Sequence, residues 1–182
     1  MSGPAPIYLD HNATTPLHPE ALERMLPYLT HLTGNPSSLH ASGQEARAGV
    51  DSARQQVANL LGCAAGEVHF TSGGTEADNW AIKGLAAGAE RPGRIITSAI
   101  EHHAVWQSCE HLRGRSGYEV VYVPVGQDGV VRVDRLIEVL DSGDTPLFVS
   151  VMHANNETGV LQPVAQIGKA VRARGIPFHV DA

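Results

Sequence analysis

Lysine is scarce in this 182-residue sequence, and its scarcity limits the possible partners. Only Lys83 and Lys169 occur among 13 basic residues, the arginines are scattered, and the net charge at pH 7 is −6. A protein that binds nucleic acid through the phosphate backbone needs a basic patch or stripe. We therefore expect no nucleic-acid partner.

Long hydrophobic runs are also missing. No stretch approaches the ~20 apolar residues that a membrane helix requires, and residues 1–6 show neither a basic start nor an apolar leader core. The sequence is 42% hydrophobic and 18% charged, and its length is typical of one globular domain. We expect a cytoplasmic protein with no membrane partner.

Cysteine is nearly absent, and histidine lacks the spacing of metal sites. Cys63 and Cys109 form no C-x-x-C pair, so both are expected to be reduced thiols. None of the ten histidines stands in an H-x-x-x-H or mixed Cys/His pattern. The sequence therefore predicts no metal site.

Apolar strand candidates alternate with helical stretches along most of the sequence. Strands are expected near 67–71, 94–98, 118–125, 147–152 and 177–181, and helices near 75–89, 102–114, 133–141 and 163–174. Such alternation is typical of βαβ units. The expected fold class is α/β, with a mainly parallel sheet flanked by helices.

Two more helices are expected before the first strand. A short one covers 19–31, and a longer amphipathic one follows a cap at Ser42 and ends at Gly62. The apolar residues of the longer helix recur at intervals of four and three; they are Ala46, Val50, Ala53, Val57 and Leu60.

The segment 68–79 predicts a strand that runs through two glycines into a helix. Glycines let successive backbone N–H groups converge, and a helix beginning near Thr75 adds the positive end of its dipole. This arrangement suits a phosphate group, although it also serves as a tight connection with Thr75 as a helix cap. Neither G-x-G-x-x-G nor a lysine after the glycines is present. The expected ligand is a small phosphorylated cofactor rather than a dinucleotide or ATP.

Polar groups follow four of the expected strands. Ligands bind at the carboxyl ends of parallel strands, so the glycine turn, His102, Asn155 and Asp181 are expected to face one crevice. Together they match a phosphorylated pyridine, in which Asp181 keeps the ring nitrogen protonated so that the ring withdraws electrons. In the alternative interpretation, Asp181 only caps a strand and His102 is a solvent-exposed helix residue.

Six motifs occur in order along the sequence. They are YLDHNATTP (8–16), GNPSS (34–38), TSGGTE (71–76), EHHAV (101–105), MHANNETG (152–159) and HVDA (179–182). Together they resemble the N-terminal half of a cysteine desulfurase of the NifS/IscS type, in the class V aminotransferase family. The resemblance implies a pyridoxal 5′-phosphate (PLP) enzyme with the aspartate-aminotransferase-like fold, PLP fold type I. Residues 1–182 would then be an N-terminal segment and a truncated large domain, without the small C-terminal domain.

The resemblance also implies the roles of individual residues. The implied cofactor contacts are Gly74 and Thr75 at the phosphate, His102 on the ring face, Asn155 beside the ring oxygen and Asp181 at the ring nitrogen, with His102 and Asp181 catalytic. The implied substrate-binding residues are Asn12, Ala13, Thr14 and, in the loop that ends at His40, Asn35. For Asn35, an ordinary turn is the alternative.

The implied reaction is PLP-dependent sulfur transfer from L-cysteine, which leaves alanine and an enzyme persulfide for iron–sulfur cluster or thio-cofactor assembly. The implied partners are a second copy in a homodimer and sulfur-acceptor or iron–sulfur scaffold proteins.

The family's cofactor-binding lysine and sulfur-accepting cysteine have no counterpart in the sequence, because its two lysines and two cysteines fall in or at the ends of helical stretches. The chain alone is therefore expected to be inactive, and a complementary C-terminal polypeptide would supply the rest. Two alternatives are another enzyme of this fold, such as a selenocysteine lyase or an aminotransferase, and a noncatalytic binding module.

Overall fold

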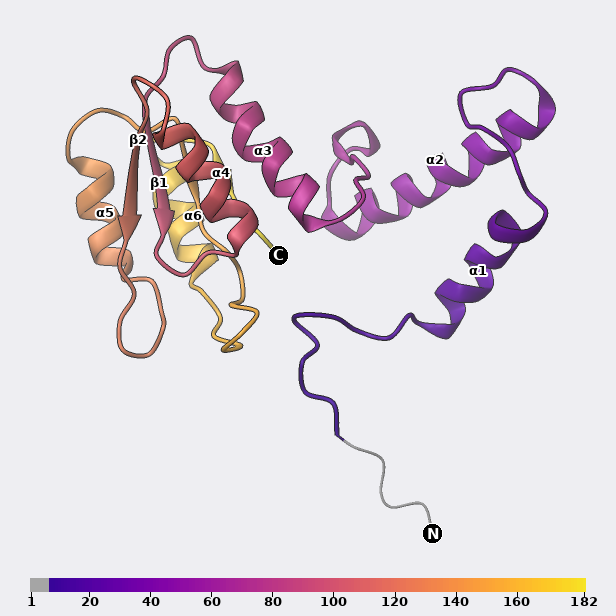
Figure 1. Cartoon of the computed structure of the whole chain (residues 1–182), viewed down its shortest axis with the longest axis horizontal. Helices are drawn as coiled ribbons and strands as arrows, with labels where there is room; N and C mark the ends of the chain where they lie inside the picture. The colour runs from indigo at the N-terminus through magenta and orange to yellow at the C-terminus, as the bar shows by residue number, and fades with distance from the viewer. Residues whose placement is uncertain (1–6) are drawn as a thin grey trace. The chain divides into compact units, whose positions relative to one another are not determined.

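The computed structural model describes residues 7–182. The prediction that residues 1–6 contain no leader concerns residues outside this range. The chain divides into two compact units. One is made of residues 15–70, and the other combines the segment up to Thr14 with residues 71–182. Elements of both units are labelled in Figure 1.

The larger unit is built on a four-stranded sheet with the strand order β2-β1-β3-β4. The strands are β1 (Arg94–Ser98), β2 (Glu119–Val123), β3 (Phe148–Ser150) and β4 (Phe178–His179). All three pairings are parallel. The predicted α/β fold with a mainly parallel sheet is confirmed.

Four α-helices alternate with these strands along the chain. They are α3 (Gly74–Gly88), α4 (His103–Arg113), α5 (Val133–Asp141) and α6 (Val164–Arg172). All four coincide with predicted helices to within two residues at each end. The connection from each strand to the next therefore passes through a helix, as parallel pairing requires.

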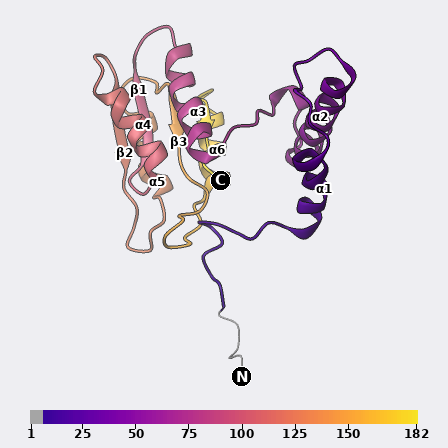
Figure 2. The same ribbon diagram turned by 45° about the vertical axis from the view of Figure 1, so that its right-hand side comes forward.

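Different helices cover the two faces of the sheet (Figure 2). Side chains alternate along a strand, so Ile95 and Ile96 of β1 point to opposite faces. Ile95 packs with Phe148 and with residues of α3 and α4, whereas Ile96 packs with Val149 and with residues of α5 and α6. These four side chains are fully buried, which places the centre of the sheet between two apolar layers.

The smaller unit contains helices α1 (Pro19–Thr30) and α2 (Ala41–Leu61) and the short 3-10 helix η1 (Ala65–Glu67). The two α-helices approach closely at Gly49, where an added Cβ would lie 2.3 Å from the hydroxyl oxygen of Tyr28. A larger residue at this position would have to displace the Tyr28 side chain.

Three sequence predictions for the smaller unit are wrong in detail. Residues 68–70 form no strand, and the Val68 carbonyl accepts a hydrogen bond from Arg54 Nε at 3.1 Å instead of from a neighbouring strand. Helix α2 is capped by His40, whose Nδ1 accepts from Gly43 N at 3.4 Å, and not by Ser42. Leu60 was placed on the packed face, but it is 85% exposed.

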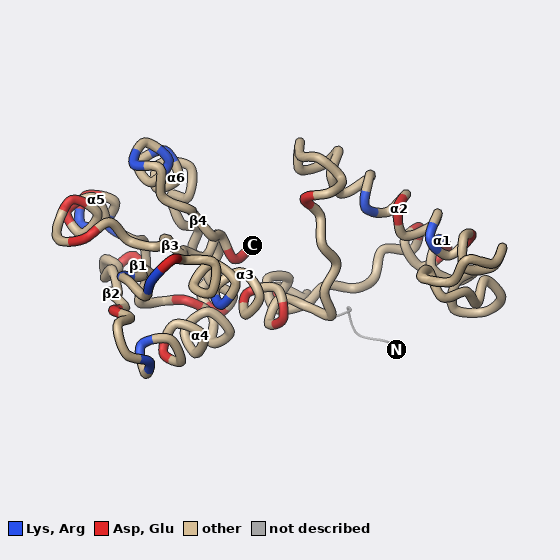
Figure 3. Tube along the Cα trace, turned by 90° about the horizontal axis from the view of Figure 1, so that it is seen from above, with Lys and Arg blue, Asp and Glu red and all other residues tan. Residues whose placement is uncertain are grey.

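Charged residues of both signs are interspersed over the elements (Figure 3). Basic residues lie on helices of both units, as the scattered arginines in the sequence indicate. Among residues 7–182, no helix combines the length and the apolar character that a bilayer crossing needs.

Candidate active site

A cavity of about 660 Å³ lies at the carboxyl ends of the strands of the larger unit. Segments far apart in the sequence contribute to its wall: the N-terminal segment, the start of α3 and the turns after β1, β3 and β4. The lining residues are Asn12, Ala13, Gly74, Thr75, Asp78, His102, Met152, His153, Ala154, Asn156, Leu161, Asp181 and Ala182. Six of the nine site residues predicted from the sequence therefore line this cavity, and Thr14, Asn35 and Asn155 do not.

The start of α3 presents backbone N–H groups to this cavity. Gly73 is the N-cap and supplies no side chain, and the first-turn N–H groups of Gly74 and Thr75 have no earlier carbonyl within the helix to bind. A Cβ added to Gly73 or Gly74 would meet no atom within 4 Å, so the turn borders open space. The helix begins one residue before Thr75, so Thr75 is not its cap, as the alternative interpretation had it. This end of α3 can accept an anion.

Glu76 fixes the turn before α3. Its Oε2 accepts hydrogen bonds from Ser72 N at 2.7 Å and from Ser72 Oγ at 2.6 Å. These bonds, the hydroxyl first and then the backbone N–H, lower the pKa of Glu76. The carboxylate thus holds the glycine turn while the N–H groups of the first turn stay available.

His102 lies at the junction between β1 and α4. It is the N-cap of α4, and its Nδ1 accepts a hydrogen bond from Ala104 N at 3.2 Å. A neutral ring that accepts at Nδ1 carries its proton on Nε2. The cap therefore orients the imidazole, and its position in the cavity wall leaves it able to contact a ligand.

Asp181 follows β4 and reaches the same cavity. Its carbonyl accepts a hydrogen bond from His153 N at 2.7 Å, which extends the pairing of Val151 N with His179 O. The backbone on both sides of this contact is thus held by strand pairing. The carboxylate is free to act as an anionic group in the cavity.

A second carboxyl group, which the sequence analysis missed, lies beside Asp181. Asp78 of α3 is only 4% exposed, and burial first and then Asp181 raise its pKa to about 6. A carboxylate oxygen of Asp78, a ring nitrogen of His102 and a carboxylate oxygen of Asp181 all lie within 4.8 Å of one another. A single cation could reach all three groups, so the absence of a metal site stays a prediction. Asp78 could have been found in the sequence because Ile82 and Ala86 follow it at four-residue intervals on the buried face of α3.

Asn155 is not in the cavity wall; its side chain bonds the turn after β1 and its own turn. Its Nδ2 donates to the Ile100 carbonyl at 3.1 Å, and its Oδ1 accepts from the backbone N–H groups of Glu157 and Thr158 at 3.1 and 2.9 Å. The neighbouring Asn156 lines the cavity instead. The role of Asn155 at a ring oxygen stays a prediction.

The substrate-side residues are divided between several places. Asn12 and Ala13 line the cavity, but Thr14 does not; its carbonyl accepts from the Tyr8 hydroxyl at 3.1 Å. Asn35 belongs to the smaller unit, where its Oδ1 accepts from Ser37 N at 2.9 Å in a local turn. A substrate contact by Thr14 or Asn35 stays a prediction.

The lysines and cysteines lie where the sequence placed them. Lys83 is exposed on α3 and donates to Asn79 Oδ1 at 2.6 Å, and Lys169 is exposed on α6. Cys109 is buried in α4, and burial raises the pKa of its thiol to about 12. At neutral pH this thiol is protonated and is a poor nucleophile.

Comparisons with known proteins agree on one family. The aminotransferase class-V family model matches residues 7–182. The chain is 46% identical over 177 residues to the cysteine desulfurase IscS of Methanosarcina thermophila, covering 97% of this chain and 43% of that protein. It is 47% identical to the putative cysteine desulfurase IscS 1 of Bacillus subtilis, covering 97% of this chain and 46% of that protein.

Solved structures also match this chain over nearly its whole length. A NifS-like protein superposes with a TM-score of 0.89 at 39% identity, covering 97% of this chain and 48% of that one. SspA in complex with cysteine superposes with a TM-score of 0.88 at 35% identity, covering 96% of this chain and 50% of that one. The chain thus spans about half the length of these relatives.

Proposed function

The chain belongs to the aminotransferase class-V family, and on that premise we propose that it supplies the PLP cradle of a cysteine desulfurase. The proposed reaction of the whole protein transfers sulfur from L-cysteine, leaving alanine, for iron–sulfur cluster or thio-cofactor assembly. Its proposed location is the cytoplasm. The similarity to IscS and NifS-like proteins supports this choice within the family.

The groups that line the cavity suit PLP in charge. The open N–H groups at the start of α3 suit the phosphate, the Asp181 carboxylate suits a protonated ring nitrogen, and His102 provides a flat ring in the same wall. When bound, PLP supplies an electron-withdrawing ring. The single observation that carries the proposal is that the start of α3 and Asp181 line one cavity of about 660 Å³.

The chain's own residues have separate tasks in this proposal. Gly74 and Thr75 bind the phosphate through N–H groups, which fixes one end of the cofactor. Asp181 holds a proton at the ring nitrogen by charge, and His102 covers the ring face and excludes water from it. Asn12 and Ala13 line the side from which L-cysteine would enter.

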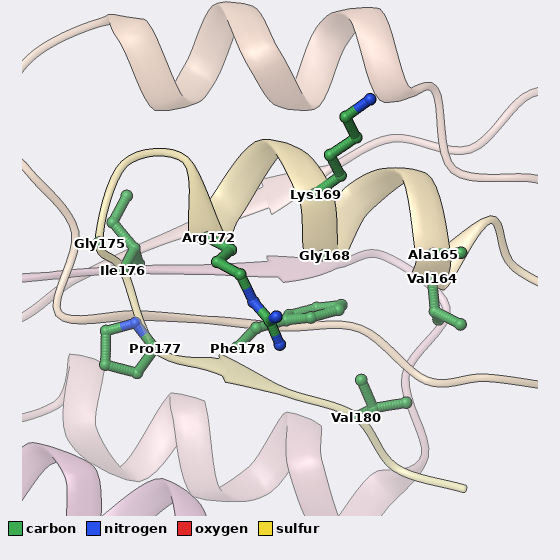
Figure 4. Close-up of a pocket in the computed structure, with 10 residues that line it drawn as sticks. All are labelled: Val164, Ala165, Gly168, Lys169, Arg172, Gly175, Ile176, Pro177, Phe178 and Val180. Atoms are coloured by element: carbon green, nitrogen blue, oxygen red, sulfur yellow. The ribbon is translucent and has the colours of Figure 1, made fainter.

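The groove between α6 and β4 suits the proposed complementary C-terminal polypeptide. β4 lies at an edge of the sheet, and among residues 7–182 no strand pairs with its outer side. A groove of about 870 Å³ beside it is lined by α6 and by the segment around β4, including Arg172, Phe178 and Val180 (Figure 4). An added strand would cover this edge and satisfy its backbone groups.

Two further kinds of partner are part of the proposal. A second copy of the whole protein would complete a homodimer, as the family resemblance implies. Sulfur-acceptor or iron–sulfur scaffold proteins would bind at a later stage.

Two other functions remain distinguishable by experiment. A selenocysteine lyase or an aminotransferase of this family would use the same cradle with a different substrate. A noncatalytic binding module is favoured by one observation, namely that both lysines are exposed on helices outside the cavity wall.

Binding of pyridoxine 5′-phosphate, the alcohol form of the cofactor, tests the proposal. This ligand has no aldehyde to react with surface lysines, so calorimetry of the purified chain reports the cradle alone. We expect saturable binding that Asp181→Asn weakens about tenfold or more, because a charge-assisted hydrogen bond is lost. Asp144→Asn, in an exposed loop, is the matched control and should bind as the unaltered chain does. Equal affinities for all three proteins would contradict the assignment of Asp181.

A further inference from the structure

Asp78 occupies a position on α3 that packing alone would give to an apolar residue. It shares the buried face of the helix with Ile82 and Ala86, each at most 3% exposed. Burial of a carboxyl group without compensation is costly. Such a group is often found where a protein binds or reacts with a ligand.

The contacts of Asp78 hold its carboxyl group toward β4. Its Oδ1 lies 3.5 Å from Nε2 of His179, and Nδ1 of His179 lies 2.9 Å from the Ser150 hydroxyl. Burial lowers the pKa of His179, so the ring is neutral at neutral pH and the contact with Asp78 is not an ion pair. A neutral ring can donate from Nε2 to Asp78 and accept at Nδ1 from Ser150.

Asp78 and Asp181 together make one part of the cavity strongly anionic. Both line the cavity, and carboxylates this close to each other repel. Within the described range 7–182, no lysine or arginine lines this cavity. In the same range, the other titratable groups near Asp78 are His102, His179 and Glu101, none of which carries a fixed positive charge. A cationic group on a ligand would relieve the repulsion.

We propose that Asp78 is a second binding carboxylate of this cavity, which acts with Asp181 to select a planar ligand whose ring nitrogen is protonated. The inference rests on the proposed function and adds to it a residue that determines which ring the cavity accepts. His179 and Ser150 keep Asp78 in place through the contacts described above.

Two ligands that differ only at the ring nitrogen test this inference. One is pyridoxine 5′-phosphate, and the other is its benzene analogue, in which C–H replaces the ring nitrogen and no proton can be held. The dissociation constants of both are measured at pH 7 for the unaltered chain, for Asp78→Asn and for the exposed control Asp144→Asn. We expect the unaltered chain and the control to prefer the pyridine, and Asp78→Asn to lower that preference at least fivefold.

A purely structural role of Asp78 gives a different result. Loss of packing would weaken both ligands equally and leave their ratio unchanged, and that outcome would overturn the inference. If the unaltered chain binds neither ligand, the proposed function fails first and the inference falls with it. Asp78→Asn is isosteric and removes a buried charge, so it should fold; Asp78→Ser is the second variant. If neither variant folds, Asp78 serves packing, which also contradicts the inference.

Discussion

Glu101 joins two parts of the candidate site through one carboxylate oxygen. Its Oε1 accepts from Met152 N at 3.1 Å and from the Ser98 hydroxyl, so the turn after β1 is tied to the end of β3. Its Oε2 is buried and has no hydrogen-bond partner among residues 7–182. Burial is the main cause that raises the pKa of Glu101 to about 7. A proton on this side chain would therefore stabilise the fold near the cavity.

The stability of the chain should depend on the proton of Glu101. Its pKa rises from 4.5 to about 7 on folding, so its stabilising contribution is complete below pH 4.5 and is lost as the pH rises through 7. Relative to Glu101→Gln, which cannot ionise, the free energy of unfolding of the unaltered chain should fall by roughly 3 kcal/mol between pH 4.5 and pH 7. Urea unfolding of both proteins at several pH values measures the difference.

The exposed Glu138→Gln on α5 is the control for this prediction. Its difference from the unaltered chain should change little with pH, because exposed ion pairs contribute little to stability. A constant difference between the unaltered chain and Glu101→Gln from pH 4 to pH 8 would show that Glu101 does not change its proton affinity on folding.

At the scale of single residues, the sequence identified the groups that end strands but not those that face inward from helices. Asp181 and His102 were recognised because each follows a predicted strand, and both line the cavity. Asp78 was missed because it falls within a helix, where an acidic residue ordinarily faces solvent. The sequence assigned Asn155 to a ligand, and that role stays a prediction; the sequence did not reveal that its side chain also hydrogen-bonds the Ile100 carbonyl and the Thr158 N–H group.

At the scale of elements, helices and central strands were predictable because their patterns are strong and local. The helix expected at 133–141 is α5 (Val133–Asp141), where a polar face alternates with the buried Leu136 and Leu140. The strand expected at 94–98 is β1 (Arg94–Ser98), which is buried throughout. Both signals depend on periodicity within one short segment.

Elements that need a distant partner were less predictable. The segment 67–71 has the composition of a strand, yet it contains the end of η1 and irregular backbone. The strand expected at 177–181 is reduced to Phe178–His179 at the edge of the sheet. Strand formation depends on hydrogen bonds to a neighbour, and composition does not reveal whether that neighbour is present.

At the scale of the whole molecule, the chain covers 43% and 46% of the length of the two IscS relatives described above. We expect the purified chain with PLP to release no alanine from L-cysteine, because its lysines are exposed on helices and its helical thiol is buried. A chromatographic assay of alanine checks this, and release above the rate without protein would contradict it.

The central claim is that one ligand bridges the start of α3 and Asp181. The most direct measurement is a nuclear magnetic resonance titration with pyridoxine 5′-phosphate labelled with nitrogen-15 in the ring. It is performed at a pH at which the ring nitrogen of the free ligand is unprotonated. The account predicts that the amide signals of Gly74 and Thr75 shift and saturate together with a change of the ring nitrogen to its protonated form. Amide signals that do not move, or a ring nitrogen that stays unprotonated in the saturated complex, would contradict it.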